Sequence, residues 1–277
     1  MASMYTQYKK LIIPILIIVV FFTWYFLRQP SNNRIWSLDQ QVLPYAEFGG
    51  DIITVFNIRN FTYTAVRKYT PAYYNKIFNL NDLKSVDYIV EPFGNMGAAH
   101  TFLSFGFGTG DYLAISVEIR KEVDESFSPI KGLFRNYELM YVIADERDVI
   151  KLRTNYRKDT VYLYPVKNSQ ESIQTLFVDM LKRANKLREK PEFYNTLTNT
   201  CTTNIASHIN KIAPSKIPWD PRLLFPKNSD ALAYELGLID NSVTLKELRK
   251  QHKINEKAER YADYPDFSKL IRKQVND

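Results

Sequence analysis

The chain has 277 residues, a formal net charge of +7, 45% hydrophobic residues and 24% charged residues. It is long enough to bury a large core, and its 19 tyrosines and 17 phenylalanines exclude a disordered protein, because disordered chains carry few aromatic residues. Lysines and arginines are spread along the sequence without a dense basic cluster, so the positive charge indicates an anionic membrane surface and not nucleic acid.

The first expected element is a membrane-spanning helix. The run from Leu11 to Leu27 carries no charge, and at about 1.5 Å per residue it nearly matches a hydrocarbon core of roughly 30 Å. Lys9 and Lys10 flank its near end, which predicts a cytosolic N-terminus and an exported remainder. Phe26–Pro30 does not resemble a small-residue cleavage site, so an uncleaved signal anchor is favoured over a cleaved signal peptide.

Predicted strands dominate the next part of the chain. A hairpin turn is expected at Gly108–Asp111, between two of them. Runs rich in β-branched and aromatic residues predict strands at Ile52–Phe61, Val86–Val90, His100–Phe107, Tyr112–Arg120, Glu138–Ile143 and Thr160–Tyr164.

Helical spacing of apolar residues begins at Ser169. A second helix is expected from about Cys201 to just before Pro214, and the segment from Thr244 onward is expected to be charged, partly helical and peripheral. Strands followed by helices are typical of an α+β fold. We assign residues 1–35 to the anchor and linker, 36–241 to one domain and 242–277 to the tail. The face of the first helix is predicted from Ile173, Leu176, Phe177, Met180, Leu181, Ala184 and Leu187.

Cys201 is the only cysteine of a chain expected in an oxidising compartment, where cysteines usually pair as disulfides. An unpaired cysteine is either an inert core residue or a thiol kept for chemistry. Asn199 and Thr200 are helix-capping residue types, which puts Cys201 in the first turn of its helix. Backbone N–H groups in that turn stabilise an anion and can form an oxyanion hole, so Cys201 is the predicted nucleophile.

A nucleophilic cysteine needs a base, and the chain has three histidines. His208 lies two helical turns after the cysteine, roughly 10 Å along the axis, and is expected to pack in the core. His252 lies in the tail and is expected to be solvated. His100 begins a predicted strand after the small residues Gly97–Ala99, and it is the candidate base.

Glu118 is the candidate for orienting the imidazole. Ser116, Glu118 and Arg120 alternate onto one face of the strand that should pair with the His100 strand. An ion pair between Glu118 and Arg120, or across the strands, is an interpretation that remains equally open.

A local cluster of carboxylates, Asp145, Glu146 and Asp148, suggests a metal site. No histidine or further carboxylate lies near it in sequence, so a solvated strand end is favoured. No metal and no other cofactor is therefore expected.

Several separated blocks resemble one known family. They occur in the same order as in the Lnb-type periplasmic domain family, and the resemblance runs from about Trp36 to Gly237. Members are similar to papain-like thiol enzymes in permuted order, with histidine before cysteine. The blocks are Asn57–Phe61, His100–Phe105, Ser116–Arg120, Asp145–Asp148, Pro191–Asn195 and Asn199–Thr203.

The resemblance implies a permuted papain-like, NlpC-like antiparallel sheet packed with helices, with Cys201 as nucleophile and His100 as base. Glu118 carries over only as a member of its block. The family is named for lipoprotein N-acyltransferases, whose members can be longer and carry extra membrane segments after this domain. The thiol chemistry therefore carries over more firmly than the substrate. We expect Asn199, Thr200, Thr202, Ser116 and Arg120 to serve oxyanion or substrate binding.

The sequence therefore predicts a single-pass, inner-membrane thiol acyltransferase with a periplasmic catalytic domain. Membrane phospholipid is the expected acyl donor and a lipoprotein N-terminus the expected acceptor. A thiol amidase or peptidase acting on cell-wall peptide remains an alternative, which a polar cleft would favour over an apolar trough. A non-catalytic binding protein is a second alternative, which a large separation of Cys201 from His100 would favour.

Overall fold

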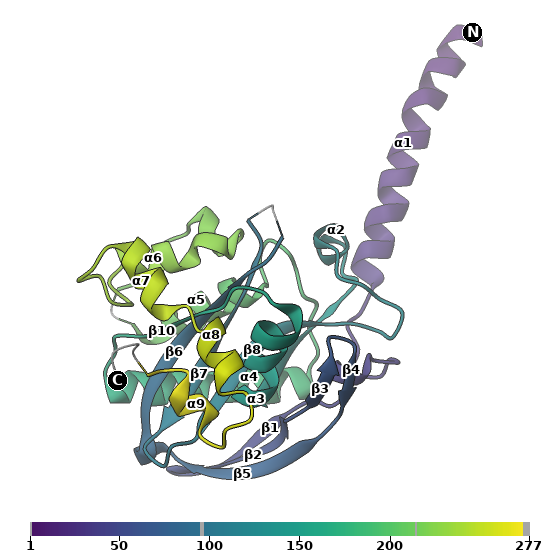
Figure 1. Cartoon of the computed structure of the whole chain (residues 1–277). Coiled ribbons are helices and arrows are strands. Elements are labelled where there is room, and N and C mark those ends of the chain that lie inside the picture. Colours follow the sequence, from purple (N-terminus) through teal and green to yellow (C-terminus); the bar gives the residue numbers. More distant parts are fainter. Residues whose placement is uncertain (1, 95–96, 214, 274–277) are drawn as a thin grey trace.

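A mixed sheet with helices on both faces forms the body of the protein, and one long helix, α1 (Ala2–Leu27), extends away from it (Figure 1). The computed structural model describes the backbone of residues 2–94, 97–213 and 215–273, and within these ranges the side chains from Ile12 onward. The chain is a mixed α+β protein, as the sequence predicts.

The main sheet has the strand order β1-β2-β9-β8-β7-β6-β10, with β5 paired to β2. Neighbouring strands are antiparallel except β2 and β9, which meet in parallel at Arg59 and Ala144. A separate hairpin joins β3 (Thr62–Ala65) to β4 (Lys68–Thr70). The strands of the main sheet are β1 (Tyr45–Gly49), β2 (Ile52–Arg59), β5 (Tyr73–Asn79), β6 (Leu83–Pro92), β7 (Ala99–Phe107), β8 (Tyr112–Arg120), β9 (Glu138–Asp145) and β10 (Tyr162–Pro165).

All six predicted strands are confirmed as β2, β6, β7, β8, β9 and β10, and the predicted turn joins β7 to β8 as an antiparallel hairpin. The sequence missed β1, β3, β4 and β5. These strands belong to the outer part of the sheet or to the separate hairpin, where many of their side chains are exposed. Their sequences therefore lack the apolar run that marks the central strands.

One face of the sheet is covered by α4 (Gln170–Glu189) and α5 (Cys201–Ile212). The buried residues of α4 are the seven that its helical spacing predicts. Ser169 caps this helix, accepting a hydrogen bond from Ser172 N at 3.2 Å. The predicted second helix is confirmed as α5, while Pro214 lies outside the described residues. This layer holds the nucleophile candidate against the sheet.

The opposite face is covered by α3 (Glu146–Lys151) and by the C-terminal helices α8 (Asn255–Arg260) and α9 (Phe267–Leu270). The prediction of a peripheral tail is therefore wrong. Arg272 closes the layer, because its guanidinium contacts Asp87 at 2.7 Å and Glu146 at 2.6 Å. Apolar side chains were too sparse in the tail for the sequence to reveal this packing. Those that are buried are Leu248, Ile254, Ala258, Phe267 and Ile271.

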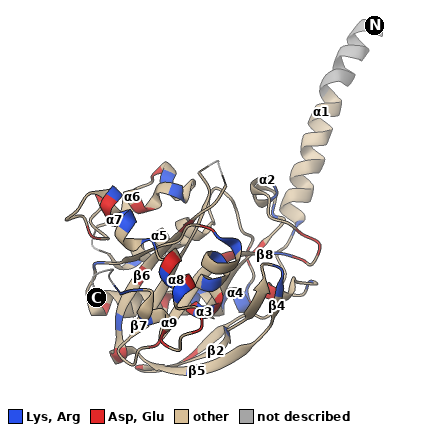
Figure 2. Cartoon of the chain, in the orientation of Figure 1, with Lys and Arg blue, Asp and Glu red and all other residues tan. Residues whose placement is uncertain are grey.

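Helix α1 touches the body only near its C-terminal end among the described residues. The ring of Phe21 lies 5.7 Å from that of Phe134, and Arg135 Nη1 donates to Tyr25 O at 3.0 Å. Phe134 follows α2 (Pro129–Leu133), which lies beside the base of α1 in Figure 1. From Ile12 to Leu27, α1 carries no charged side chain (Figure 2), and most of its large apolar side chains there are exposed.

The described residues include no helix that is both long and apolar enough to cross a membrane. Leu11, where the predicted span begins, and its flank Lys9 and Lys10 have side chains that lie outside the description. The transmembrane helix therefore stays a prediction.

The remaining helical segments are short and connect the larger elements. They are η1 (Leu38–Gln40), η2 (Leu80–Asp82), the π-helix η3 (Leu152–Arg157), η4 (Pro221–Leu223), η5 (Pro226–Asn228), α6 (Ser229–Glu235) and α7 (Leu245–His252).

Candidate active site

Cys201 is the first residue of α5, as predicted, and it is a free cysteine. Thr200 caps the helix reciprocally with Thr203. Thr200 Oγ1 accepts from Thr203 N at 3.2 Å, and Thr203 Oγ1 accepts from Thr200 N at 2.8 Å. In a helix start the N–H groups of the first residues have no acceptor within the helix, so those of Cys201 and Thr202 can serve an oxyanion.

His100 lies at the start of β7, opposite Glu91 of β6. Its Nε2 lies 2.6 Å from Ser116 Oγ, and that hydroxyl lies 2.9 Å from Glu118 Oε1. The direct separation of His100 Nε2 and Glu118 Oε1 is 3.7 Å, too long for a good hydrogen bond. Ser116 therefore stands between the imidazole and the carboxylate that the sequence predicted to orient it.

The order of donors along this relay fixes the tautomer of His100. Glu118 is an acceptor when ionised, so the hydroxyl of Ser116 donates to it and accepts from His100 Nε2–H. His100 Nδ1 then carries a lone pair, and it has no hydrogen-bond partner among the described residues. Nδ1 is consequently the atom that can accept a proton.

Arg153 is a part of the site that the sequence analysis missed. It belongs to the π-helix η3, an uncommon element often found at functional sites. Its guanidinium donates to Glu118 Oε1 at 3.2 Å and to Glu91 Oε2 at 2.7 Å, and it is 3% exposed. The π-helix marks this part of the site only in the structure, because nothing in the sequence pattern predicts it.

Burial and Arg153 set the charge states of the relay. Burial, followed by the nearby Arg153 guanidinium, lowers the pKa of His100 to about 3, although Glu118 opposes this change. Burial would raise the pKa of Glu118, but Arg153 and His100 hold it well below its usual range. At neutral pH the relay is therefore a neutral imidazole beside an ionised carboxylate, so His100 is in the unprotonated form that a general base needs.

His100 and Cys201 line one cavity of about 180 Å³. Among the described contacts no hydrogen bond joins them, and the polar neighbour of Cys201 Sγ is Thr202 Oγ1 at 3.7 Å. One part of the lining is charged, and the other is apolar or aromatic. Besides His100 and Cys201, the charged lining residues are Glu118, Arg153 and Arg157, and the apolar or aromatic ones are Phe93, Ala99, Val117, Ile119, Phe127 and Tyr194.

Three of the predicted binding residues lie in the turn that carries the cysteine. Thr200 and Thr202 flank the cysteine, where Thr200 caps α5 and Thr202 Oγ1 lies 3.0 Å from Thr101 Oγ1. Asn199 supports the same turn, because its amide donates to Phe193 O at 2.9 Å. These side chains stabilise the turn, so the groups of the turn that remain available to a substrate are its backbone N–H groups.

Arg120 does not line this cavity, so the structure does not bring it together with the other predicted site residues. Its guanidinium donates to Gln40 O at 2.9 Å and to Gln41 O at 2.8 Å, and it stacks 4.2 Å from the Trp36 ring. These contacts tie the segment after α1 to the sheet. Strand alternation placed Arg120 on the right face but could not show which element covers it.

The other two histidines are structural. His208 is buried, as predicted, with Nε2 at 2.7 Å from Tyr141 Oη and Nδ1 at 2.5 Å from Asp179 Oδ2. His252 is not simply solvated, because its Nδ1 lies 2.8 Å from Leu163 O. It is a contact between the tail and the sheet.

The carboxylates at the end of β9 are buried in ion pairs, so the prediction of a solvated strand end is wrong. Asp148 accepts from Arg59 Nε and Nη2, each at 2.9 Å, and Glu146 pairs with Arg272. Asp145 caps α3 through Arg147 N. No group of three or more potential metal ligands occurs among the described residues. The family block at this position thus serves the core of the fold.

Comparison with known proteins gives one match. The family model of the Lnb N-terminal periplasmic domain matches residues 69–227, more than half of the chain, and this range contains both the cysteine and the candidate base. No curated protein and no solved structure matches the chain.

Proposed function

The chain belongs to the Lnb N-terminal periplasmic domain family and so carries a periplasmic domain, and on this premise we propose that it is a membrane-anchored thiol acyltransferase. The donor is membrane phospholipid and the acceptor is the N-terminal amine of a lipoprotein. The observation that carries the proposal is the shared cavity of Cys201, at a helix start, and His100, in a relay with Ser116 and Glu118.

The first half-reaction loads the enzyme. Cys201 Sγ attacks the carbonyl carbon of a phospholipid ester while His100 Nδ1 accepts the thiol proton, through one water or after closer approach. Backbone N–H groups at the start of α5 hold the oxyanion. The ester C–O bond then breaks, and the departing alcohol oxygen takes the proton from His100. The products are a lysophospholipid and an acyl thioester on Cys201.

The second half-reaction transfers the acyl group. The lipoprotein amine attacks the thioester carbonyl and loses a proton to His100. The C–S bond breaks, and the sulfur takes that proton. An N-acylated lipoprotein leaves, and the free thiol is restored, so each turnover consumes one ester and one amine without any oxidant or cofactor.

We also propose that α1 spans the inner membrane with a cytosolic N-terminus. Its described side chains are uncharged, and Trp24 and Tyr25 lie near the end that joins the domain, where aromatic rings favour the membrane interface. An anchor raises the effective concentration of a lipid substrate. Reporter fusions after Asn33 should be active only with exported reporters, and cytosolic reporter activity would reverse the topology.

A thiol amidase acting on cell-wall peptide is the second candidate. The charged part of the cavity favours it, because Arg157 is exposed at its rim and could pair with a peptide carboxylate. Acylation by a lipid ester and cleavage of a wall peptide would use the same thiol and base, so only the substrate separates the two functions.

Mass spectrometry of the intact protein tests the proposal. Incubation with phospholipid vesicles should add a fatty-acyl mass that hydroxylamine removes and that Cys201→Ala lacks. A peptide with a diacylated N-terminal cysteine should discharge the adduct and appear as the N-acylated product. Cleavage of a wall peptide, with no acyl adduct under any lipid composition, would transfer the protein to the amidase class.

A further inference from the structure

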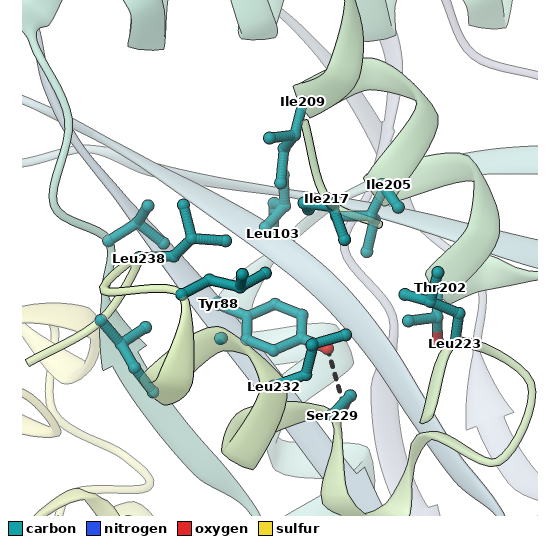
Figure 3. A pocket seen from close by; sticks show the side chains of 15 residues that line it. Tyr88, Leu103, Thr202, Ile205, Ile209, Ile217, Leu223, Ser229, Leu232 and Leu238 are labelled. Carbon is teal, nitrogen blue, oxygen red and sulfur yellow. Dashed lines mark hydrogen bonds between the residues drawn. The ribbon is translucent and has the colours of Figure 1, made fainter. Parts of the chain in front are cut away.

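A second cavity, of about 50 Å³, lies beside the nucleophile's helix (Figure 3). Its walls come from α5, from the neighbouring strands β6 and β7, and from α6 with the residues after it. Aliphatic side chains make up most of the lining, among them Leu103, Ile205, Ile209, Leu232 and Leu238. An apolar cavity of this kind stays dry and accepts apolar ligands.

The few hydroxyl groups in the lining are already satisfied. Tyr88 Oη donates to Ser229 Oγ at 2.7 Å, the dashed contact in Figure 3, and Ser229 Oγ donates to Pro226 O at 2.7 Å. Thr202 Oγ1 pairs with Thr101 Oγ1. A ligand with polar groups would find no unpaired partner here, so the lining selects hydrocarbon.

The cavity begins at the turn that carries Cys201. Thr202, the next residue, lines one end of it, and Ile209 lines it seven residues further along α5, about 10 Å away. The turn that carries the thiol and the apolar cavity are therefore adjacent along α5.

We infer that this cavity holds the acyl chain of the donor, with the carbonyl at Cys201 and the hydrocarbon running along α5 toward Ile209. The inference rests on the proposed acyl transfer and adds to it a chain-binding site. As it stands the cavity encloses only a short part of a chain.

Chain length is the first readout. Acylation of the full-length protein by p-nitrophenyl esters of straight-chain acids should rise about fourfold in kcat/KM for each methylene that enters the cavity, and should then level off. Ala206→Leu fills the cavity from α5, so the plateau should move to shorter chains. Ala184→Leu is the matched control, because Ala184 is also a buried helical alanine of this core but does not line the cavity.

A binding readout without turnover separates this inference from the proposed function. Cys201→Ala protein is irradiated with a straight-chain fatty acid that carries a terminal diazirine, and the labelled peptides are mapped. Label on Ile205, Ile209 or Leu232 supports the cavity even if no acyl transfer is found. Acyl transfer with label elsewhere, or with a chain-length profile that Ala206→Leu leaves unchanged, overturns the inference while the proposed function stands.

If Ala206→Leu fails to fold, Leu238→Ala gives the opposite test. It enlarges the cavity, so the plateau should move to longer chains. An unchanged plateau in that folded variant also overturns the inference.

Discussion

Removing the hydroxyl of Ser116 should cripple acylation of Cys201 while the protein stays folded. Ser116 is fully buried and relays between His100 and Glu118. In Ser116→Ala the Nε2–H of His100 loses its acceptor, and Glu118 lies too far away at 3.7 Å to replace it. Nothing then holds the proton on Nε2, so His100 can shift to the tautomer that carries it on Nδ1.

The size of the effect follows from the relay's hydrogen bonds. A hydrogen bond backed by a charged carboxylate is worth about 1.5–3 kcal/mol, so its loss moves the tautomer ratio by roughly 10- to 100-fold. The change of tautomer lowers the rate by up to this factor, and loss of all general-base catalysis sets a ceiling of about 10⁴. Leaving the N–H buried without an acceptor costs about 1–3 kcal/mol of stability. At about 2–4 °C per kcal/mol the melting temperature falls by roughly 2–12 °C.

Ser104→Ala is the matched control for this experiment. Ser104 is equally buried in the same sheet, and its hydroxyl donates to a carboxylate, Glu146 Oε1, at 2.5 Å. It should lose comparable stability and keep its acylation rate. The assay is the burst of p-nitrophenol from an acyl ester, normalised to folded protein. The relay would be refuted if Ser116→Ala had the wild-type burst rate and the same melting temperature as Ser104→Ala.

Three further variants test other parts of the structure. Glu118→Gln should slow the burst and also lower the melting temperature. Arg153 keeps its ion pair with Glu91 in this variant but loses a charged acceptor worth about 1.5–3 kcal/mol. An unchanged melting temperature would contradict the ion pair between Arg153 and Glu118. The pKa of His100 is about 3 in the folded protein, whereas a histidine of the unfolded chain takes up a proton below about pH 6.5. The free energy of unfolding should therefore fall by on the order of 1.4 kcal/mol per pH unit as the pH drops through this window. Urea unfolding of His100→Gln should show a smaller loss of stability between pH 6.5 and 4 than urea unfolding of the wild type. Arg272→Ala leaves buried carboxylates without their cation and should cost about 3–5 kcal/mol, with proteolysis in the tail; wild-type stability would mean that the tail is not part of the core.

The sequence predicts the parts of this fold where burial and periodicity coincide. The seven apolar residues of α4 share one helical face, and the hairpin of β7 and β8 has alternation and turn residues together. The C-terminal tail lacks that signal, since its buried residues are separated by charged ones. Its place on the sheet depends on Arg272 reaching Asp87 and Glu146, contacts between residues 126 or more positions apart that no local pattern contains.

In the candidate site, too, the sequence predicts only what local patterns encode. Cys201 could be placed from its capping residues, because a helix start is local, and His100 from the strand that it begins. The relay could not, because the alternation that put Ser116 and Glu118 on one face did not say which of them reaches the imidazole.

Arg153 is the residue that the sequence could least reveal and that changes the chemistry most. Burial lowers the pKa of His100 and the charge of Arg153 adds to this effect, while the same charge keeps Glu118 ionised in spite of its burial. His100 is therefore in the unprotonated form that a general base toward the thiol of Cys201 needs. Replacing Arg153 should raise the pKa of His100, so the acylation burst of the variant should be lost at a higher pH than that of the wild type as the imidazole becomes protonated.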